Sequence, residues 1–288
     1  MPDAPRFSVT IPAYNAEATL AETVGSVLAQ TFTDFEVVIV DDGSTDGTRA
    51  LAESLAAVDS RIRVISQENR GSGGAYNTAI RNARADLIVM LSADDLLVPE
   101  HLSAFDPFIA ENPEASVFTS GGWYEYEDGT REHSTLHERW ANRQECTLND
   151  LLSACFFGIG AVFRREVFDK LGGFDEDIYA EDYVFWLLAM ANGFSHRFLN
   201  RPLAIHRRNS VQKSADALRM RRADVRAVRE VMETGLLSPR EISTAKRVIR
   251  RHLANIAIRL TLGALLGNDG ATRLIDRLRS RHHPSQEA

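Results

Sequence analysis

The sequence predicts an α/β fold, with a mostly parallel sheet flanked by helices and an α-helical appendage at the carboxyl end. Through the first half of the chain, short apolar runs alternate with helical stretches, which is the pattern of repeated βαβ units. Beyond Gln212 the sequence is helical, with turns at Leu237–Pro239 and around Gly267–Gly270. We therefore expect a main domain over residues 1–210 and a basic helical appendage over residues 211–288.

Strand and helix patterns follow one another closely in the first half of the chain. Each strand is a short apolar run, as expected for a sheet that helices cover on both faces. The expected strands are Phe7–Ile11, Phe35–Val40, Arg63–Ser66 and Asp86–Leu91. The expected helices lie near Ala18–Ala29, Gly47–Ala57 and Ser72–Ala83. After an irregular, aromatic stretch over Gly121–Asn149, one more strand is expected at Gly160–Arg164 and a short helix at Arg165–Leu171.

Polar and acidic segments follow three of the expected strands. In parallel sheets, ligands bind beyond the carboxyl ends of the strands, near a switch in strand order. Pro12–Asn15, Asp41–Asp46 and Ser92–Asp95 should therefore lie along one rim. Carboxylates at two strand ends can hold a hard divalent cation and orient a charged ligand, although single acids at such places more often form turns or cap helices. Together they predict a ligand site.

Charge is divided unevenly along the chain. Residues 1–200 contain 14 Lys and Arg against 32 Asp and Glu, whereas residues 201–288 contain 19 against 8. This division indicates that the last third has a different partner or docks onto the acidic part, with a solvated basic helical face as the alternative. The basic residues form no recognisable nucleic-acid-binding module, so no nucleic-acid partner is expected.

The sequence also predicts where the protein is found. It has no run of 18 apolar residues, and its amino terminus lacks a basic region followed by an apolar stretch. A cytoplasmic location is expected, with peripheral contact at the inner face of the membrane as an option. Cys146 and Cys155 are nine residues apart and form no CxxC pair, which argues against a zinc site and a disulfide framework.

Six segments of the chain, taken in order, resemble the motifs of the family 2 glycosyltransferases. These enzymes have the A-type glycosyltransferase fold and transfer a sugar from a nucleotide diphosphate. The resemblance covers roughly residues 6–210, and the Gln-x-x-Arg-Trp sequence of processive members is missing. It therefore implies a nucleotide-binding sheet and transfer of one sugar per encounter. The matching segments are Val9–Asn15, Val38–Asp46, Asn69–Gly71 with Asn77, Leu91–Asp95, Gly172–Glu176 and Glu181–Asp182.

The resemblance implies a donor site for a UDP- or dTDP-sugar. Pro12 and Tyr14 would flank the base, and Asp42 would accept a hydrogen bond from the base or its ribose, since uracil and thymine present an N–H donor. The alternatives are a rim-facing core role for Tyr14 and helix capping for Asn15 and Asp46. The nucleotide-sugar-binding set is Pro12, Ala13, Tyr14, Asn15, Asp41, Asp42, Asn77, Ser92, Ala93 and Asp94.

The resemblance also implies a divalent metal, Mg²⁺ or Mn²⁺. In the family's Asp-x-Asp pattern the last acid binds the metal, and that position is Asp94 here. Ser92 replaces the first acid and adds no charge, so a weaker metal dependence is expected. Asp95 is expected to support the site rather than to bind the metal. His206 lies where many members carry a histidine near the metal or the diphosphate, with a structural role as the alternative.

Glu181 and Asp182 open an apolar helical stretch, where their charges suit the positive end of a helix. In the family the second acid of this pair is the general base, which implies that Asp182 deprotonates the acceptor hydroxyl. Glu181 would then orient Asp182 or contact the acceptor. A single displacement of the nucleotide diphosphate would invert the configuration of the anomeric carbon. Synthesis of cell-surface polysaccharide, glycolipid or a related glycoconjugate is expected, and the alternative is a non-catalytic subunit that binds a nucleotide sugar or glycan.

Two further features concern the acceptor. Acceptor loops are expected in the irregular stretch, where aromatic faces can stack on sugars, while Trp186 is expected to pack in the core. Residues 246–266 alternate arginines with apolar residues, which suits an anionic membrane surface carrying lipid-linked acceptors. Packing on the same domain or on a second subunit is the favoured alternative. The clustered aromatic residues are Trp123, Tyr124, Tyr126 and Trp140.

Overall fold

The computed structural model describes residues 4–134, 143, 146–153, 157, 159–208 and 216–280, without the side chains of Gly263 and residues 266–280. In this part of the chain, a nine-stranded sheet has the order β3-β2-β1-β4-β8-β6-β9-β5, and β7 pairs with β6. The strands are β1 (Phe7–Ala13), β2 (Phe35–Asp41), β3 (Ile62–Ser66), β4 (Leu87–Met90), β5 (Leu96–Leu97), β6 (Val117–Tyr126), β7 (Arg131–His133), β8 (Val162–Arg164) and β9 (His196–Arg208).

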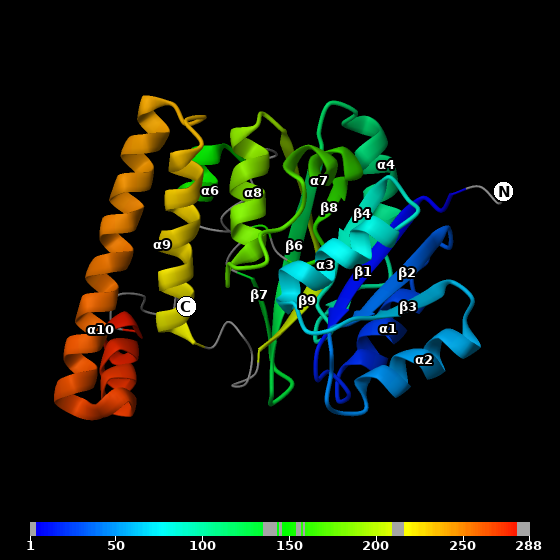
Figure 1. The fold of residues 1–288 in the computed structure, drawn as a ribbon, viewed down its shortest axis with the longest axis horizontal. Coiled ribbons are helices and arrows are strands. Elements are labelled where there is room, and N and C mark those ends of the chain that lie inside the picture. The colour runs from blue at the N-terminus through cyan, green and yellow to red at the C-terminus, as the bar shows by residue number, and fades with distance from the viewer. Residues whose placement is uncertain are drawn as a thin grey trace, which may run out of the picture.

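Helices cover both faces of the sheet (Figure 1). Alternate residues of β4 pack to opposite sides, Val89 toward α1, α2 and α4 and Ile88 toward α3, α7 and α8. This alternation shows why β4 is apolar throughout. The helices are α1 (Leu20–Leu28), α2 (Thr48–Val58), α3 (Gly71–Asn82), α4 (His101–Glu111), α6 (Leu148–Ser153), α7 (Arg165–Leu171), α8 (Glu181–Ala191), α9 (Ala217–Glu233) and α10 (Pro239–Ser280).

The predicted fold class is confirmed. The pairs β1–β2, β1–β4 and β2–β3 are parallel, whereas β8 is antiparallel to both β4 and β6. The strand and helix patterns of the first half correspond to β1 through β4 and to α1, α2 and α3. Because β2 and β4 flank β1, the strand order switches at β1, and the three polar segments follow these adjacent strands.

One expectation about local structure is wrong. The first part of the stretch Gly121–Asn149 is not irregular, because residues through Tyr126 belong to β6, which pairs with the 13-residue β9 far away in the sequence. The turn expected around Gly267–Gly270 falls within α10, which is assigned as helix from Pro239 to Ser280 but reverses direction before its red end in Figure 1.

The carboxyl-terminal helices pack onto the rest of the molecule. α9 lies between α8 and α10 (Figure 1). Val228 and Val231 of α9 and Val248 of α10 are buried in the same apolar core as Trp186 of α8. The basic third of the chain is thus docked rather than separate, although the boundary at residue 210 lies outside the described residues and stays a prediction.

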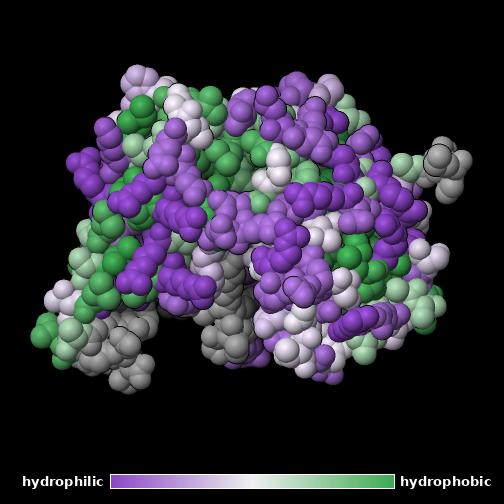
Figure 2. Space-filling view, viewed as in Figure 1, coloured by the Kyte–Doolittle hydropathy of each residue, from purple (hydrophilic) through white to green (hydrophobic). Residues whose placement is uncertain are grey.

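Part of α10 exposes apolar side chains on the surface of the molecule. Hydrophobic side chains gather along the distal part of α10, at the lower left of the view in Figure 2. Leu253, Ile258 and Leu265 of this segment are 44%, 53% and 72% exposed. Within the described residues, no helix combines the length and the apolar character needed to cross a bilayer. Cys146 is a buried free thiol, and Cys155 lies outside the described residues.

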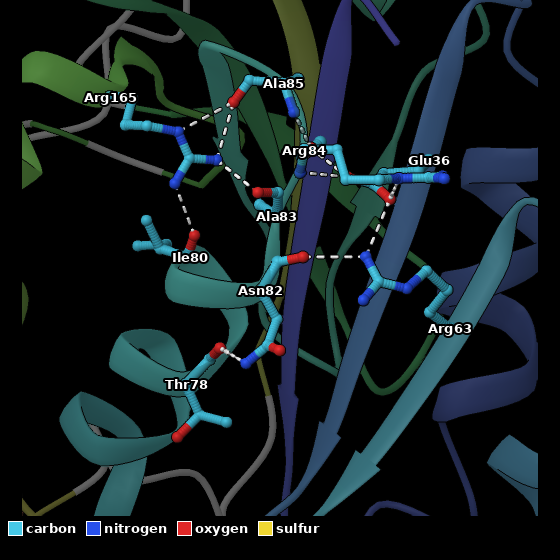
Figure 3. Close-up of polar contacts among 10 residues, drawn as sticks. Glu36, Arg63, Thr78, Ile80, Asn82, Ala83, Arg84, Ala85 and Arg165 are labelled. Carbon is cyan, nitrogen blue, oxygen red and sulfur yellow. Dashed lines mark hydrogen bonds and ion pairs between the residues drawn. The ribbon is translucent and has the colours of Figure 1, made fainter. Parts of the chain in front are cut away.

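A polar network fixes α3 to the sheet at the end opposite the polar rim (Figure 3). Arg165 donates to the main-chain carbonyls of Ile80, Ala83 and Ala85, which satisfies carbonyls at the carboxyl end of α3. Glu36 of β2 is fully buried and accepts hydrogen bonds from Ser8 and from the main-chain and side-chain nitrogens of Arg84. This anchoring sets the position of the amino end of α3, which reaches the rim.

Candidate active site

A cavity of about 1000 Å³ lies beyond the carboxyl ends of β1, β2 and β4. Its walls come from the segments after these strands, from α3, β6, β9 and α8, and from the start of α9. A volume of this size accommodates a ligand larger than a single sugar. The cavity brings together most of the residues proposed from the sequence, namely Pro12, Ala13, Tyr14, Asn15, Asp42, Ser92, Ala93, Asp94, Glu181, Asp182 and His206.

Asp42 presents a buried, preorganised carboxylate to the cavity. Asp42 is 2% exposed, and its Oδ1 accepts hydrogen bonds from Gln67 Nε2 at 2.6 Å and from Arg70 N at 2.9 Å. Both donors come from the segment that leads into α3. Gly43 makes this turn possible, because its φ is 74° and a Cβ there would lie 2.9 Å from Asn69 N. Local geometry therefore fixes Asp42 before any ligand binds.

Asn15 ties the segment after β1 to the segment after β2. It has a φ of 49°, donates from N to Ser44 Oγ at 3.0 Å and accepts at Oδ1 from Thr45 N at 2.8 Å. Asp46 precedes the N-cap residue of α2, and its Oδ1 accepts a hydrogen bond from N of Thr48, the first residue of the helix, at 3.0 Å. The neighbouring Tyr14 is 53% exposed, so it is not a core residue. An aromatic face is thus available at the rim beside Asp42.

Asp41 and Asn77 do not line the cavity in this structure. Asp41 accepts from Ser44 N at 3.2 Å and so shapes the turn after β2. Asn77 is 2% exposed and binds Phe174 in both directions, through Nδ2 to its carbonyl and through Oδ1 to its N–H. Nδ2 also donates to Glu176, whose carboxylate accepts two hydrogen bonds from Arg70. Both residues position other parts of the site.

Asp94 and His206 line the cavity from the segment after β4 and from β9. The His206 Nδ1 atom is 3.2 Å from Asp95 Oδ1, but the two atoms are not aligned as a hydrogen bond. Asp95 is 1% exposed and accepts from Arg207 N, and burial raises its pKa while the His206 ring opposes that shift. Asp95 thus borders the Nδ1 side of the ring.

The side chains in this region fit a cation that is shared with a phosphorylated ligand. Within the described residues, no three His, Cys, Asp or Glu side chains converge into a group that could hold a metal by themselves. Mg²⁺ in proteins is often bound by one or two carboxylates together with substrate phosphates. Asp94 supplies one such carboxylate and His206 an imidazole on the same cavity.

Glu181 and Asp182 begin α8, as the sequence predicts, and both line the cavity. Glu181 is 6% exposed, and Asp182 Oδ1 accepts from Tyr183 N at 2.8 Å. Acidic groups are favoured in the first turn of a helix because the macrodipole is positive there. The helix therefore places two carboxyl groups at its positive end, against the cavity.

Tyr76 of α3 is a site residue that no motif indicated. Its hydroxyl hydrogen-bonds Ser92, and burial raises its pKa well above the ordinary value, with the charges of Glu181, Asp182 and Asp95 acting in the same direction. A tyrosine inside an ordinary helical stretch gives no local signal. Its position, however, places Ser92 and the two acids of α8 around one neutral phenol.

The aromatic residues divide between cavity and core. Trp123 and Tyr124 line the cavity, whereas Tyr126 lies outside it and hydrogen-bonds Glu132. Trp186 borders the cavity but is 1% exposed and packs edge-on against Phe157 and Phe163, which confirms its expected core role. Trp140 lies outside the described residues.

Known proteins resemble this chain in sequence and in fold. The model of the family "Glycosyl transferase family 2" matches residues 8–172. Chondroitin synthase of Escherichia coli is 35% identical over 195 residues, which are 67% of this chain and 28% of that protein. A UDP-Glc:α-D-GlcNAc-diphosphoundecaprenol β-1,3-glucosyltransferase of Escherichia coli, WfgD, is 32% identical over 182 residues, 62% of this chain and 68% of that one. The chain thus spans less than a third of the first of these relatives.

Two solved structures have the same fold. Residues 1–349 of Staphylococcus aureus TarS in complex with UDP-GlcNAc superpose with a TM-score of 0.69 and 22% identity, covering 86% of this chain and 71% of that one. The mannosyltransferase PcManGT of Pyrobaculum calidifontis in complex with GDP-Man and Mn²⁺ gives 0.64 and 21%, covering 99% and 89%. Because the family model matches more than half of its length, this chain belongs to glycosyl transferase family 2.

Proposed function

We propose that this enzyme transfers a sugar from a UDP- or dTDP-sugar to an acceptor hydroxyl, with inversion at the anomeric carbon, in the synthesis of a surface polysaccharide or related glycoconjugate. One observation carries the proposal. A buried carboxylate suited to a nucleotide base, Asp42, and the helix-start acids Glu181 and Asp182 line the same cavity at the switch in strand order. WfgD uses UDP-Glc, and TarS was crystallised with UDP-GlcNAc, which supports this donor class.

Asp42 is proposed to select the base of the donor. Its Oδ1 is occupied by Gln67 and Arg70, so Oδ2 is the oxygen we assign to the base N–H or the ribose. Uracil and thymine present such a donor between two carbonyl groups. Tyr14, Pro12 and Ala13 border the same end of the cavity, where Tyr14 offers a stacking face.

Asp94 and His206 would hold a divalent cation together with the donor diphosphate. A cation there would neutralise the charge that develops on the departing diphosphate. PcManGT was crystallised with Mn²⁺, which supports this assignment. Ser92 contributes a hydroxyl without charge, so we propose a metal requirement weaker than that of a site with two acids.

Asp182 is proposed as the general base. The acceptor hydroxyl would lie against its carboxylate and lose its proton as the oxygen attacks the anomeric carbon from the face opposite the diphosphate. Glu181, beside it and buried, would hold Asp182 or the acceptor in place. A single displacement of this kind inverts the configuration of the anomeric carbon.

A panel of nucleotide sugars tests the donor proposal. We expect UDP- or dTDP-sugars, but not GDP-, CMP- or ADP-sugars, to raise the melting temperature, with a larger shift when Mn²⁺ is present. The same donors should then transfer sugar to a glycan or lipid extract. A shift with GDP-sugars only would contradict the base assignment. Binding of UDP-sugars without transfer to any acceptor would instead favour the non-catalytic subunit, the reading to which Ser92 gives some support.

We also propose that the distal part of α10 touches an anionic membrane surface, where a lipid-linked acceptor would be found. Between Leu253 and Leu265 the exposed side chains are apolar except for Thr261, and Arg250 and Arg251 precede them. Such a combination suits the boundary between headgroups and acyl chains, because arginines pair with anionic lipid while the apolar side chains insert. The net positive charge of residues 201–288 adds to this attraction.

Vesicle sedimentation tests the membrane contact. Wild-type protein should sediment with phosphatidylglycerol-containing vesicles at low salt, less so at high salt, and not with pure phosphatidylcholine. Leu260→Glu should release it severalfold, because a charge replaces an inserting side chain. Leu236→Glu is the matched control, since Leu236 and Leu260 are both 49% exposed and Leu236 precedes α10. Equal binding of both variants, or a Leu260→Glu protein that merely changes from dimer to monomer, would contradict the proposal.

A further inference from the structure

The cavity is strongly acidic, yet its proposed substrates are anions. Within the described lining there are only two guanidinium groups, Arg208 and Arg219, against seven carboxylates. Like charges a few ångströms apart in a partly desolvated site repel one another by several kcal/mol, so a phosphorylated substrate needs a cation beside each phosphate group. The seven acids are Asp42, Asp94, Asp95, Glu176, Asp177, Glu181 and Asp182.

Arg208 belongs to the donor side of the cavity. It lies two residues after His206 on β9 and therefore on the same face of the strand. Its Cζ is 4.4 Å from the centre of the Tyr124 ring, and the Tyr124 ring in turn meets the His206 ring edge-on at 5.7 Å between centroids. Arg208 is thus placed beside the residue that we assign to the donor diphosphate and its cation.

Arg219 reaches the cavity from a different direction, the first turn of α9. Its Cζ lies 3.9 Å from the centre of the Tyr179 ring. Burial raises the pKa of Tyr179, the charge of Arg219 opposes that shift and the charge of Glu181 adds to it, which places all three side chains in one neighbourhood. Arg219 therefore lies in the part of the cavity that Glu181 borders, next in sequence to the proposed base Asp182.

The charge of Arg219 is available to a ligand. In the described part of the chain, no ion pair joins the Arg219 guanidinium to a carboxylate, although the charges of Asp216 and Glu181 act on its stacking partner Tyr179. Stacking on Tyr179 holds one face of the guanidinium and leaves its N–H edge free to bind oxygen atoms in a fixed orientation. A planar fork of this kind matches two oxygens of a phosphate group.

We infer that Arg219 binds a phosphate group of the acceptor, close to the sugar whose hydroxyl is glycosylated. The enzyme's acceptors are accordingly phosphate-bearing glycans or lipids, and α9 is part of the acceptor site rather than a structural appendage. Met220, the next residue of α9, also lines the cavity and offers an apolar contact beside the phosphate. This inference rests on the proposed glycosyltransferase function, because it places Arg219 relative to Asp182 and the donor.

Calorimetry with the donor pocket filled tests the inference. Wild-type protein saturated with UDP and Mg²⁺ is titrated with decyl diphosphate, with inorganic pyrophosphate and with decyl maltoside. We expect decyl diphosphate to bind, pyrophosphate to bind more weakly and decyl maltoside to bind least. Arg219→Ala should weaken decyl diphosphate at least about tenfold, Arg219→Lys should restore part of the affinity, and both should keep the wild-type affinity for UDP.

Arg229→Ala is the matched control, because Arg229 is exposed on the same helix and does not line the cavity. It removes one positive charge from α9 and should leave all three probes unchanged. Equal weakening by Arg219→Ala and Arg229→Ala, or no phosphate binding by the wild type, would overturn the inference. Loss of UDP affinity in Arg219→Ala would also overturn it, by assigning Arg219 to the donor. If the wild type fails to bind UDP at all, the proposed function fails first.

Discussion

Asp182→Asn should abolish sugar transfer while UDP binding stays close to that of the wild type. The asparagine Oδ1 can still accept the hydrogen bond from Tyr183 N, so the start of α8 is kept. The amide cannot take up the proton of the acceptor hydroxyl, and removal of a general base typically costs a factor of 10² to 10⁴ in rate. Initial rates with a UDP-sugar, together with UDP calorimetry, measure the two effects separately.

Asp177→Asn is the control for this experiment. Asp177 lines the same cavity and carries the same charge, but no proton-transfer role is assigned to it. Its transfer rate should remain within a few-fold of the wild type. Asp182 is not the base if Asp182→Asn still transfers at a comparable rate, or if the two variants lose equal activity, which would indicate a general effect of cavity charge.

Glu36→Ala should produce the largest loss of stability, about 2 to 4 kcal/mol. Glu36 is fully buried in β2 and accepts from Ser8 Oγ at 2.7 Å, Arg84 N at 2.5 Å, Arg84 Nε at 2.7 Å and Arg63 Nη1 at 3.3 Å. Alanine leaves the Ser8 hydroxyl and the Arg84 N–H without an acceptor. The two guanidinium groups are 37% and 52% exposed, so water compensates them in part and keeps the loss below that of a fully buried ion pair.

Urea unfolding at several pH values measures this effect and its sign. Burial acts to raise the pKa of Glu36, but the hydrogen bonds from Ser8 and Arg84 outweigh it and the pKa is lowered. The stabilisation is therefore present above the unfolded pKa of about 4.3 and is lost as the pH falls through the folded value. The difference between wild type and Glu36→Ala should accordingly shrink below about pH 4.3. Glu53→Gln is the control, because it affects only an exposed ion pair with Arg49, and it should change the free energy of unfolding by less than about 0.5 kcal/mol. An equal loss of stability in both variants would contradict the structural role assigned to Glu36.

The sequence pattern predicted the strands and helices of the first half of the chain, because short-range burial and turn preferences determine them. The apolar runs of β1, β2 and β4 and the acids that follow them indicated a parallel sheet with a polar rim, because burial on both faces requires continuous apolar strands. The long pairing between β6 and β9 could not be predicted, since it joins residues about 80 positions apart and depends on tertiary packing.

The candidate site shows the same division. The resemblance indicated Asp42, Asp94, Asp182 and His206, and the structure gathers these four around one cavity. It could not show that Asn77 holds residues 174–176 instead of lining the cavity, because that depends on a contact between α3 and a segment nearly 100 residues away. Arg219 belonged to no motif, since its role depends only on where α9 docks.

The most direct test of the account is UDP calorimetry on Asp42→Asn beside the wild type. The substitution keeps Oδ1 for Gln67 and Arg70 but converts Oδ2, the atom assigned to the base, from an acceptor to a donor. We predict that the wild type binds UDP and that Asp42→Asn, with an unchanged melting temperature in the absence of ligand, binds it at least about tenfold more weakly. Equal affinity for UDP in the two proteins would contradict the assignment of this cavity to a nucleotide donor recognised by Asp42.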